Sequence, residues 1–216
     1  MRRFLIDFSS DIRTCSYCGS FFNTGFLCSG CWQKMPWSQN GHVLIRGDNS
    51  GSQFILKYLF DWKANENRVC DALLTSLKGG FDQNVFRKLA ALHIRRHVVM
   101  SQPKAGVNLV IVPAPSKHSR ADHAFAWGRA LSDILDSKFV PSLEAIAVGN
   151  QKNKTRSERN VLELKGHENF SEFQGTVVFV DDIVTTGATA RAAYFALGRP
   201  PHFEVWSIAY RHLAAE

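Results

Sequence analysis

The stretch Val177-Val-Phe-Val-Asp-Asp-Ile-Val-Thr-Thr-Gly-Ala-Thr189 decides the fold of this 216-residue chain. Its four consecutive apolar residues are β-branched or aromatic, which indicates a central strand covered on both faces, as in a parallel α/β sheet. We expect a helix to begin near Gly187. Asp181 and Asp182 then lie at the carboxyl end of the strand, where open α/β sheets bind their ligands.

The loop after this strand carries groups that can hold a phosphate dianion. Backbone N–H groups at a helix N-terminus and the hydroxyls of Thr185, Thr186 and Thr189 can all donate to phosphate oxygens. Two adjacent carboxylates would repel a phosphate, so Asp181 and Asp182 need another partner, such as vicinal sugar hydroxyls or a divalent cation. An ordinary buried strand followed by a capped helix would explain the apolar run but not the acid pair.

The whole stretch resembles the 5-phosphoribosyl-1-pyrophosphate (PRPP) motif of type I phosphoribosyltransferases. The resemblance implies that Asp181 and Asp182 hold the ribose 2′ and 3′ hydroxyls and contribute to catalysis. It also implies that the 5′-phosphate is held by the loop residues Thr185, Thr186, Gly187, Ala188 and Thr189. Thr185 stands where 6-oxopurine transferases have the Asp that serves as their base, so that subclass is disfavoured.

The composition is typical of a globular protein, and the charge favours an acidic partner. Hydrophobic residues make up 45% of the chain and the formal net charge is +7, which favours nucleic acid first and phosphorylated metabolites second. No window approaches the roughly 18 apolar residues of a membrane span. The apolar run at the start is broken by Asp7 and lacks a small-residue cleavage site. We therefore expect a cytoplasmic protein without membrane insertion.

Four cysteines near the N-terminus have the spacing of a metal site, Cys15-x-x-Cys18 followed by Cys28-x-x-Cys31. Two such turns can place four thiolates on one Zn²⁺, and four thiolates leave no open position, so we expect a structural zinc site. The alternative is two disulfides, which a cytoplasmic location disfavours. The fifth cysteine, Cys70, is expected to be a buried core thiol.

We divide the chain into a four-cysteine module over residues 1–50 and a second domain over residues 51–216, of which residues 51–100 form a helical lead-in. Apolar spacing and cap residues predict helices over residues 54–62, 66–78, 82–100 and 119–137, and buried strands over residues 108–112 and 203–210. The alternation of strands and helices in the second half is the βαβ pattern of an α/β fold.

Two loops can complete an anion site at the same edge of the sheet. Pro113-Ala-Pro-Ser-Lys-His-Ser-Arg120 follows the strand over residues 108–112, and it offers a rigid turn, a hydroxyl and two cations. In phosphoribosyltransferases the equivalent loop binds pyrophosphate, which implies this role for Ala114, Pro115, Ser116, Lys117 and Arg120.

The second loop is Gln151-Lys-Asn-Lys-Thr-Arg-Ser-Glu-Arg-Asn160, with four cations and one acid. As an isolated charge run it would be interpreted as a solvated loop. Its position matches the mobile hood of type I enzymes, which closes on the pyrophosphate and excludes water, and this implies catalytic roles for Lys154 and Arg159.

In this order the pieces resemble the ComF family, which includes GntX-like proteins and is linked to DNA uptake in natural competence. The resemblance covers nearly the whole chain. It rests on the four cysteines, Leu77-Lys-Gly-Gly80, Val112-Pro-Ala-Pro115 with Arg120, Gln151 with Arg159, and the PRPP motif. The chain departs from the family at His123-Ala-Phe-Ala126, where Arg-Gly-Phe-Asn is common, and at Gly79, where an aromatic residue follows the lysine.

The resemblance implies a type I phosphoribosyltransferase-like α/β fold with a small N-terminal zinc-ribbon-like module, Zn²⁺ in that module and Mg²⁺ with PRPP. It implies a PRPP-binding protein that acts in DNA uptake, with competence-machinery proteins as candidate partners. The alternative is an active Mg²⁺-dependent phosphoribosyltransferase that works on an unidentified acceptor in nucleotide metabolism or salvage.

Single-stranded DNA is the nucleic acid that this function implies, and the sequence has a basic segment for it. Residues 83–120 contain seven cations and no acid. On a helix over residues 82–100, Arg87, Lys88 and Arg95 fall within an arc of about 100° that faces away from Val85, Leu89 and Leu92. We predict that these three cations track a phosphate backbone.

Overall fold

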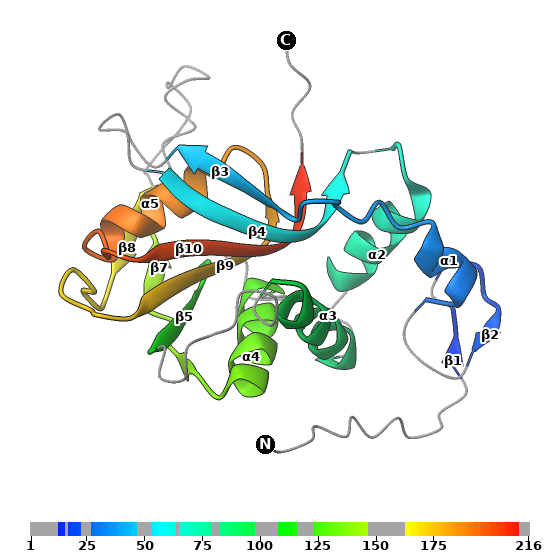
Figure 1. The fold of residues 1–216 in the computed structure, drawn as a ribbon, viewed down its shortest axis with the longest axis horizontal. Helices are drawn as coiled ribbons and strands as arrows, with labels where there is room; N and C mark the ends of the chain where they lie inside the picture. The colour runs from blue at the N-terminus through cyan, green and yellow to red at the C-terminus, as the bar shows by residue number, and fades with distance from the viewer. Residues whose placement is uncertain are drawn as a thin grey trace, which may run out of the picture.

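The computed structural model of the chain describes residues 13–15, 17–22, 27–46, 53–63, 65–78, 83–97, 108–115, 123–146 and 163–211. The elements of this part are shown in Figure 1 and are, in chain order, β1 (Arg13–Thr14), β2 (Phe21–Phe22), α1 (Ser29–Gln33), β3 (His42–Arg46), β4 (Gln53–Trp62), α2 (Arg68–Lys78), α3 (Gln83–His97), β5 (Leu109–Pro113), α4 (His123–Leu135), β6 (Lys138–Phe139), β7 (Leu143–Ala145), β8 (Leu164–Gly166), β9 (Thr176–Val184), α5 (Ala188–Ala196) and β10 (Phe203–Arg211). None of the described helices has the length and hydropathy that crossing a membrane requires.

The main sheet has six strands in the order β3-β4-β10-β9-β5-β6. All neighbours in it are parallel except β3 and β4, which form an antiparallel pair at one edge. The predicted α/β class and the strands over residues 108–112 and 203–210 are confirmed by β5 and β10. The helices predicted over residues 66–78, 82–100 and 119–137 are confirmed by α2, α3 and α4, although α2 begins only at Arg68 and α4 ends at Leu135.

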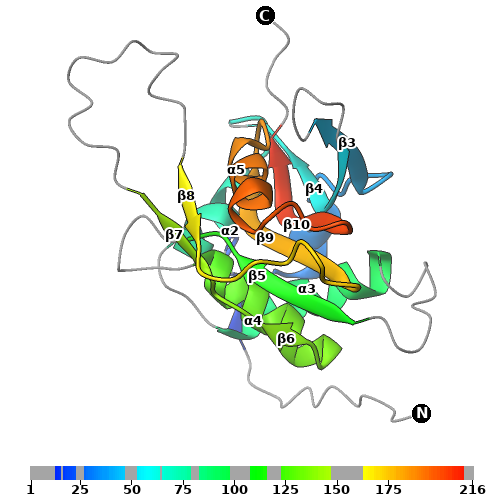
Figure 2. The same ribbon diagram turned by 90° about the vertical axis from the view of Figure 1, so that its left-hand side faces the viewer.

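The central strand β9 is buried on both faces, as its unbroken apolar run predicts. Val177 and Phe179 pack in one core with Ala193 and Leu197, which lie on and just after α5. Val178 and Val180 pack in the other core, with side chains of α3 and α4. Because successive residues of a strand point to opposite faces, this alternation sets α5 on one side of the sheet and α3 and α4 on the other (Figure 2).

The helix expected over residues 54–62 is wrong, because these residues form β4. In this strand Phe54, Leu56 and Tyr58 face the α5 side, whereas Leu59 belongs to the core on the α3 side. Apolar residues on both faces of a covered strand produce a nearly continuous run, which periodicity alone cannot distinguish from a buried helix. The β-branched and aromatic residues of the segment favoured a strand.

Connections on the two sides of the sheet diverge at β5 and β9. The chain leaves β5 through α4 to β6 on one face, and leaves β9 through α5 to β10 on the other. A doubly wound sheet has its ligand crevice at such a switch point, outside the carboxyl ends of the two strands. In this fold the residues that follow Pro113 and Val180 lie at that switch point.

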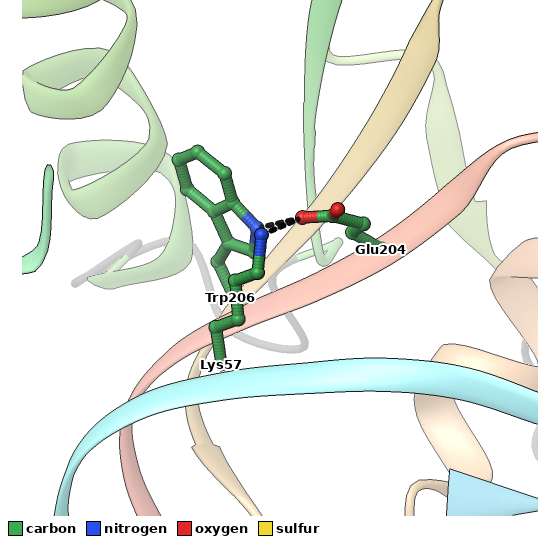
Figure 3. Close-up of polar contacts among 3 residues, drawn as sticks. All are labelled: Lys57, Glu204 and Trp206. Atoms are coloured by element: carbon green, nitrogen blue, oxygen red, sulfur yellow. Dashed lines mark hydrogen bonds and ion pairs between the residues drawn. The ribbon is translucent and has the colours of Figure 1, made fainter. Parts of the chain in front are cut away.

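A partly buried ion pair joins β4 to β10. Figure 3 shows Lys57 and Trp206 both directed at the carboxylate of Glu204. Lys57 Nζ and Trp206 Nε1 each lie 2.7 Å from Glu204 Oε2, so both donate to the same oxygen. The Lys57 ammonium also lies 5.6 Å from the centre of the Trp206 ring, within the range of a cation–π contact.

Two buried histidines of α3 continue this network into the core. The ring of His93 is fully buried and packs against His97, Trp127 and Trp206, with ring centres 4.6, 5.5 and 5.1 Å away. Burial lowers the pKa of His93 well below its usual value, and lowers the pKa of His97 to about 4. Nearby Lys57 and Arg96 add to both effects. Both rings are therefore neutral in the folded protein at neutral pH.

We predict that acid destabilises this fold through the two histidines. Their folded pKa values lie below the unfolded value of about 6.5, so the unfolded chain binds more protons and the stability is lost as pH falls from about 6.5 towards 4. Each histidine contributes a slope of up to about 1.4 kcal/mol per pH unit in this window. Urea unfolding of wild type and His93→Phe from pH 7 to pH 4 measures the effect. Equal slopes for both proteins would contradict the assignment.

Candidate functional site

The predicted PRPP residues lie where β9 extends beyond the end of β5, one of its two neighbouring strands. β9 pairs with β10 up to Val184, but its pairing with β5 ends at Val180. Asp181 and Asp182, both half-buried, follow directly. They thus stand at the carboxyl side of the β5–β9 switch point, with β10 on one flank only.

The segment after β5 lies on the other side of β9, opposite β10. The backbone N–H of Ala114 donates to the Val180 carbonyl at 2.8 Å, which fixes the start of the predicted pyrophosphate loop against β9. Ala114 is buried and Pro115 is half-buried. The remaining predicted members of this loop, Ser116, Lys117 and Arg120, lie outside the described residues, as do Lys154 and Arg159 of the basic loop.

A tight turn carries the chain from β9 into α5. Gly187 is the N-cap of α5 and has φ 72°, a left-handed conformation that favours glycine. A Cβ at this position would lie 2.9 Å from Ile45 Cδ1 of β3, so the turn is also closely packed. Thr185 and Thr186 stand in the turn, and Ala188 and Thr189 open the helix. The helix therefore begins where the sequence predicted.

Arg191 braces this turn from within α5. Its Nη1 donates to the Thr186 carbonyl at 2.8 Å and to the Arg46 carbonyl at 3.3 Å, so it connects the turn to the end of β3. Sequence patterns gave no indication of this role, because the contact joins segments that are far apart in the chain.

His123 is a second residue that the sequence analysis missed as part of the site. It is the first residue of α4, and its Nδ1 lies 3.4 Å from Asp182 Oδ2. The other oxygen of Asp182 accepts the backbone N–H of Ile183 at 2.9 Å. The sequence analysis noted His123 only as the first residue of a departure from the ComF pattern, after the predicted pyrophosphate loop.

The three predicted DNA-binding cations share one side of α3. Arg87 and Arg95 are exposed and Lys88 is half-buried. The residues that α3 buries are Phe86, Leu89, Ala90, His93 and His97. At 3.6 residues per turn the two sets occupy different sides of the helix. Of the three apolar residues from which the cations were predicted to face away, Leu89 is buried, and Val85 and Leu92 are half-buried.

The four cysteines come together, and together they could hold a metal ion such as Zn²⁺. Their sulfur atoms all lie within 4.8 Å of one another, and Cys18 Sγ is 3.6 Å from Cys28 Sγ. Four sulfurs at 2.3 Å from a tetrahedral Zn²⁺ would lie about 3.8 Å apart, so the arrangement is close to that of a filled site. No disulfide joins any of the five cysteines in this structure.

Local backbone structure produces this cluster. Cys15 and Cys18 lie between β1 and β2. Gly19, directly after Cys18, has φ 72° and donates its N–H to the Cys15 carbonyl at 2.9 Å. Cys28 is the N-cap of α1, and Cys31 lies inside this helix. Two backbone turns therefore each supply a pair of sulfur atoms, as the spacing indicated.

The thiols of the cluster differ in acidity. A hydrogen bond with the Ser20 side chain is the main cause that lowers the pKa of Cys18, and the backbone at Cys31 is the main cause that lowers the pKa of Cys28. Burial raises the pKa of Cys31 to about 12. A metal ion that binds all four sulfurs must displace the Cys31 proton, so metal affinity increases with pH.

The cysteine module shares its core with the main sheet. Leu27, Cys31 and Met35 belong to the same buried cluster as Leu59 and Phe60 of β4. Trp37 connects the two parts: its ring centre lies 4.5 Å from that of Trp32 and 5.7 Å from that of Phe60.

We predict one zinc ion per chain, lost in Cys28→Ser. Because so few residues around the cysteines cannot bury enough surface alone, removal of the metal should loosen the module and lower the unfolding temperature. Metal analysis and thermal unfolding with and without a chelator test both statements. Cys70→Ala is the matched control, since Cys70 is buried outside the cluster, and it should keep the metal. Equal metal content in Cys28→Ser and wild type would contradict the prediction.

The described residues also surround two cavities. One of about 350 Å³ lies beside the predicted pyrophosphate loop and is lined by Ala114, Pro115, Phe125 and Leu143 among others. The larger, of about 710 Å³, is lined by Asn108 and Lys138, at the amino ends of β5 and β6 and thus away from the switch point. Comparison of the chain with protein-family models gives no match, and comparison with curated proteins gives none either.

Proposed function

We propose that this protein binds PRPP, or a closely related sugar phosphate, as a ComF-type protein with a type I phosphoribosyltransferase-like fold. The observation that carries the proposal is the juxtaposition at the β5–β9 switch point. Two half-buried acids end the β5–β9 pairing, a glycine turn with φ 72° leads into α5, and the Ala114 loop lies alongside. A turn suited to anions and a pair of acceptors for hydroxyls thereby follow the same strand at the switch point.

In this proposal each group has one task. Asp181 and Asp182 accept hydrogen bonds from the ribose hydroxyls. Backbone N–H groups at the start of α5 and the hydroxyls of Thr185, Thr186 and Thr189 hold the 5′-phosphate. The pyrophosphate is held by the loop that begins at Ala114. Mg²⁺ bound with PRPP would neutralise the pyrophosphate charge.

We further propose that the protein acts in DNA uptake and binds single-stranded DNA through α3. The exposed side of this helix carries Arg87 and Arg95, next to Lys88. The chain as a whole has a net charge of +7, so a polyanion is an electrostatically favoured partner. Contacts between cations and phosphates depend little on base sequence.

The cavity beside the pyrophosphate loop favours a second candidate function, transfer of the phosphoribosyl group. Its volume of about 350 Å³ and its lining by Pro113, Phe125 and Leu143 provide room for a small, partly apolar acceptor. In such a reaction the acceptor forms a bond to C1 of PRPP as the bond to pyrophosphate breaks. Acceptor-dependent release of pyrophosphate from PRPP would distinguish this enzyme from a protein that only binds.

We predict that Asp181→Asn combined with Asp182→Asn weakens binding of ribose 5-phosphate and of PRPP. Charge-assisted hydrogen bonds contribute roughly 1.5–3 kcal/mol each, so the loss should exceed about tenfold. Gly187→Val should also weaken binding, because a side chain is strained at φ 72° and would contact Ile45. Calorimetry measures both effects. Asp133→Asn, on the exposed side of α4, is the control. Equal affinity of the double variant and wild type would reject a sugar-phosphate site.

We predict that charge reversal at Arg87, Lys88 and Arg95 weakens binding of single-stranded DNA and leaves sugar-phosphate binding intact. Loss of three phosphate contacts should reduce the slope of log affinity against log salt by about 2. Salt titration with a fluorescent oligonucleotide measures the slope. A matched control reverses three exposed lysines elsewhere, Lys63, Lys138 and Lys165, and has the same net charge. Identical slopes for the two triple variants would mean that α3 is not the binding surface.

A further inference from the structure

Both carboxylate oxygens of Asp182 have a partner in the protein. Oδ1 accepts the Ile183 N–H at 2.9 Å, and Oδ2 lies 3.4 Å from Nδ1 of His123. The backbone contact is local, whereas the imidazole comes from α4, on the far side of the switch point. Asp182 is thus held between its own strand and the helix that follows β5.

The surroundings of His123 determine which of its ring nitrogens carries the proton. The side chains of His123 and Asp182 are 18% and 21% exposed, so the contact is largely shielded from water but can still be reached by a ligand. A proton on Nδ1 faces the carboxylate favourably, whereas a lone pair there would repel it. Nε2 is buried and has no hydrogen-bond partner among the described residues, which makes it a poor place for the proton. A proton on Nδ1 is therefore favoured, and it lies beside the Asp182 carboxylate at the distance of an ion pair, longer than that of a typical hydrogen bond.

Charge explains why such a donor is useful at this position. Asp181 and Asp182 are adjacent acids, and a sugar phosphate brings further negative charge to the same crevice. The imidazole, fixed by α4, holds the Asp182 carboxylate in one orientation. Without it, repulsion from the neighbouring negative charges would turn the carboxylate away. An acceptor held in one orientation binds a correctly placed hydroxyl well and leaves an unpaired polar group when that hydroxyl is missing.

We propose that His123 is a positioning residue for Asp182 and, through it, makes the site selective for sugar phosphates with a vicinal pair of ring hydroxyls. The inference rests on the proposed sugar-phosphate function and adds a specificity determinant to it. His123 does not contact the phosphate. It acts on the part of the ligand that the two acids recognise.

The test compares ribose 5-phosphate with 2,3-dideoxyribose 5-phosphate, which keeps the ring and the phosphate but lacks both hydroxyls. The ratio of the two affinities measures hydroxyl recognition alone. Wild type should favour ribose 5-phosphate by more than about tenfold, the value of one charge-assisted hydrogen bond. His123→Ala should reduce the ratio to within about threefold of unity, with little change in affinity for the dideoxy ligand.

Two conservative variants separate positioning from space filling. The amide nitrogen of Asn lies where Nδ1 of histidine lies, so His123→Asn keeps the donor to Asp182 and should keep most of the ratio. His123→Gln is closer in volume, but its amide lies near the Nε2 position, and it should lose the ratio. A residue that only fills space would give the reverse order, which would overturn the proposal.

Two further measurements complete the design. In an Asp182→Asn background, His123→Ala should have almost no further effect on the ratio, because the two residues act as one unit. His167→Ala is the control: His167 Nε2 lies 3.2 Å from Glu144 Oε2 in an exposed pair between β7 and β8, and its loss should leave the ratio unchanged.

The outcomes distinguish this inference from the proposed function. A wild-type ratio near unity would reject the sugar-phosphate site and the role of His123 with it. A large wild-type ratio that survives in both His123→Ala and His123→Gln would reject the role of His123 alone. Thermal unfolding of each variant identifies any that fails to fold. If His123→Ala or His123→Gln does not fold, the affinity ratio of His123→Asn is compared with that of wild type.

Discussion

The placement of Asp181 and Asp182 depends on the unequal pairing of β9 with its two neighbours. β10 accompanies β9 to Val184, whereas β5 stops at Val180. This difference places two acids beside a single neighbouring strand, and the Ala114 N–H closes the gap at its base. The same pairing fixes which side chains of β9 face α4 and which face α5, because alternate residues of a strand point to opposite layers. The same strand pairing therefore positions both the acids of the site and the core side chains of β9.

Short-range patterns in the sequence predicted the elements that make this register. The apolar run before Asp181 specified a buried strand, and Gly187 marked the helix start, because each signal is contained in a few neighbouring residues. The segment from Gln53 to Trp62 was misassigned because its apolar spacing fits a helix equally well. The apolar residues face packed layers on both sides of β4, and periodicity could not show this because these layers come from distant parts of the chain.

The candidate site shows the same division. Asp181, Asp182 and the threonine turn were named from the sequence, since their spacing is itself the signal. His123 and Arg191 were not, because their partners are brought to them by the fold. The cysteines were predicted to cluster, but nothing in their spacing indicated that Trp37 would join the module to Phe60. A metal ion bound by the cysteines would consequently also stabilise the packing of β4.

Arg191 gives the turn before α5 a further property. Its guanidinium donates to the Thr186 and Arg46 carbonyls, so these protein contacts hold the turn in the conformation that the proposed phosphate site requires. A ligand then does not have to spend binding free energy on arranging this segment. Association at a site of this kind is governed by encounter and charge, and differences in affinity between related ligands appear mainly in how long each one stays bound.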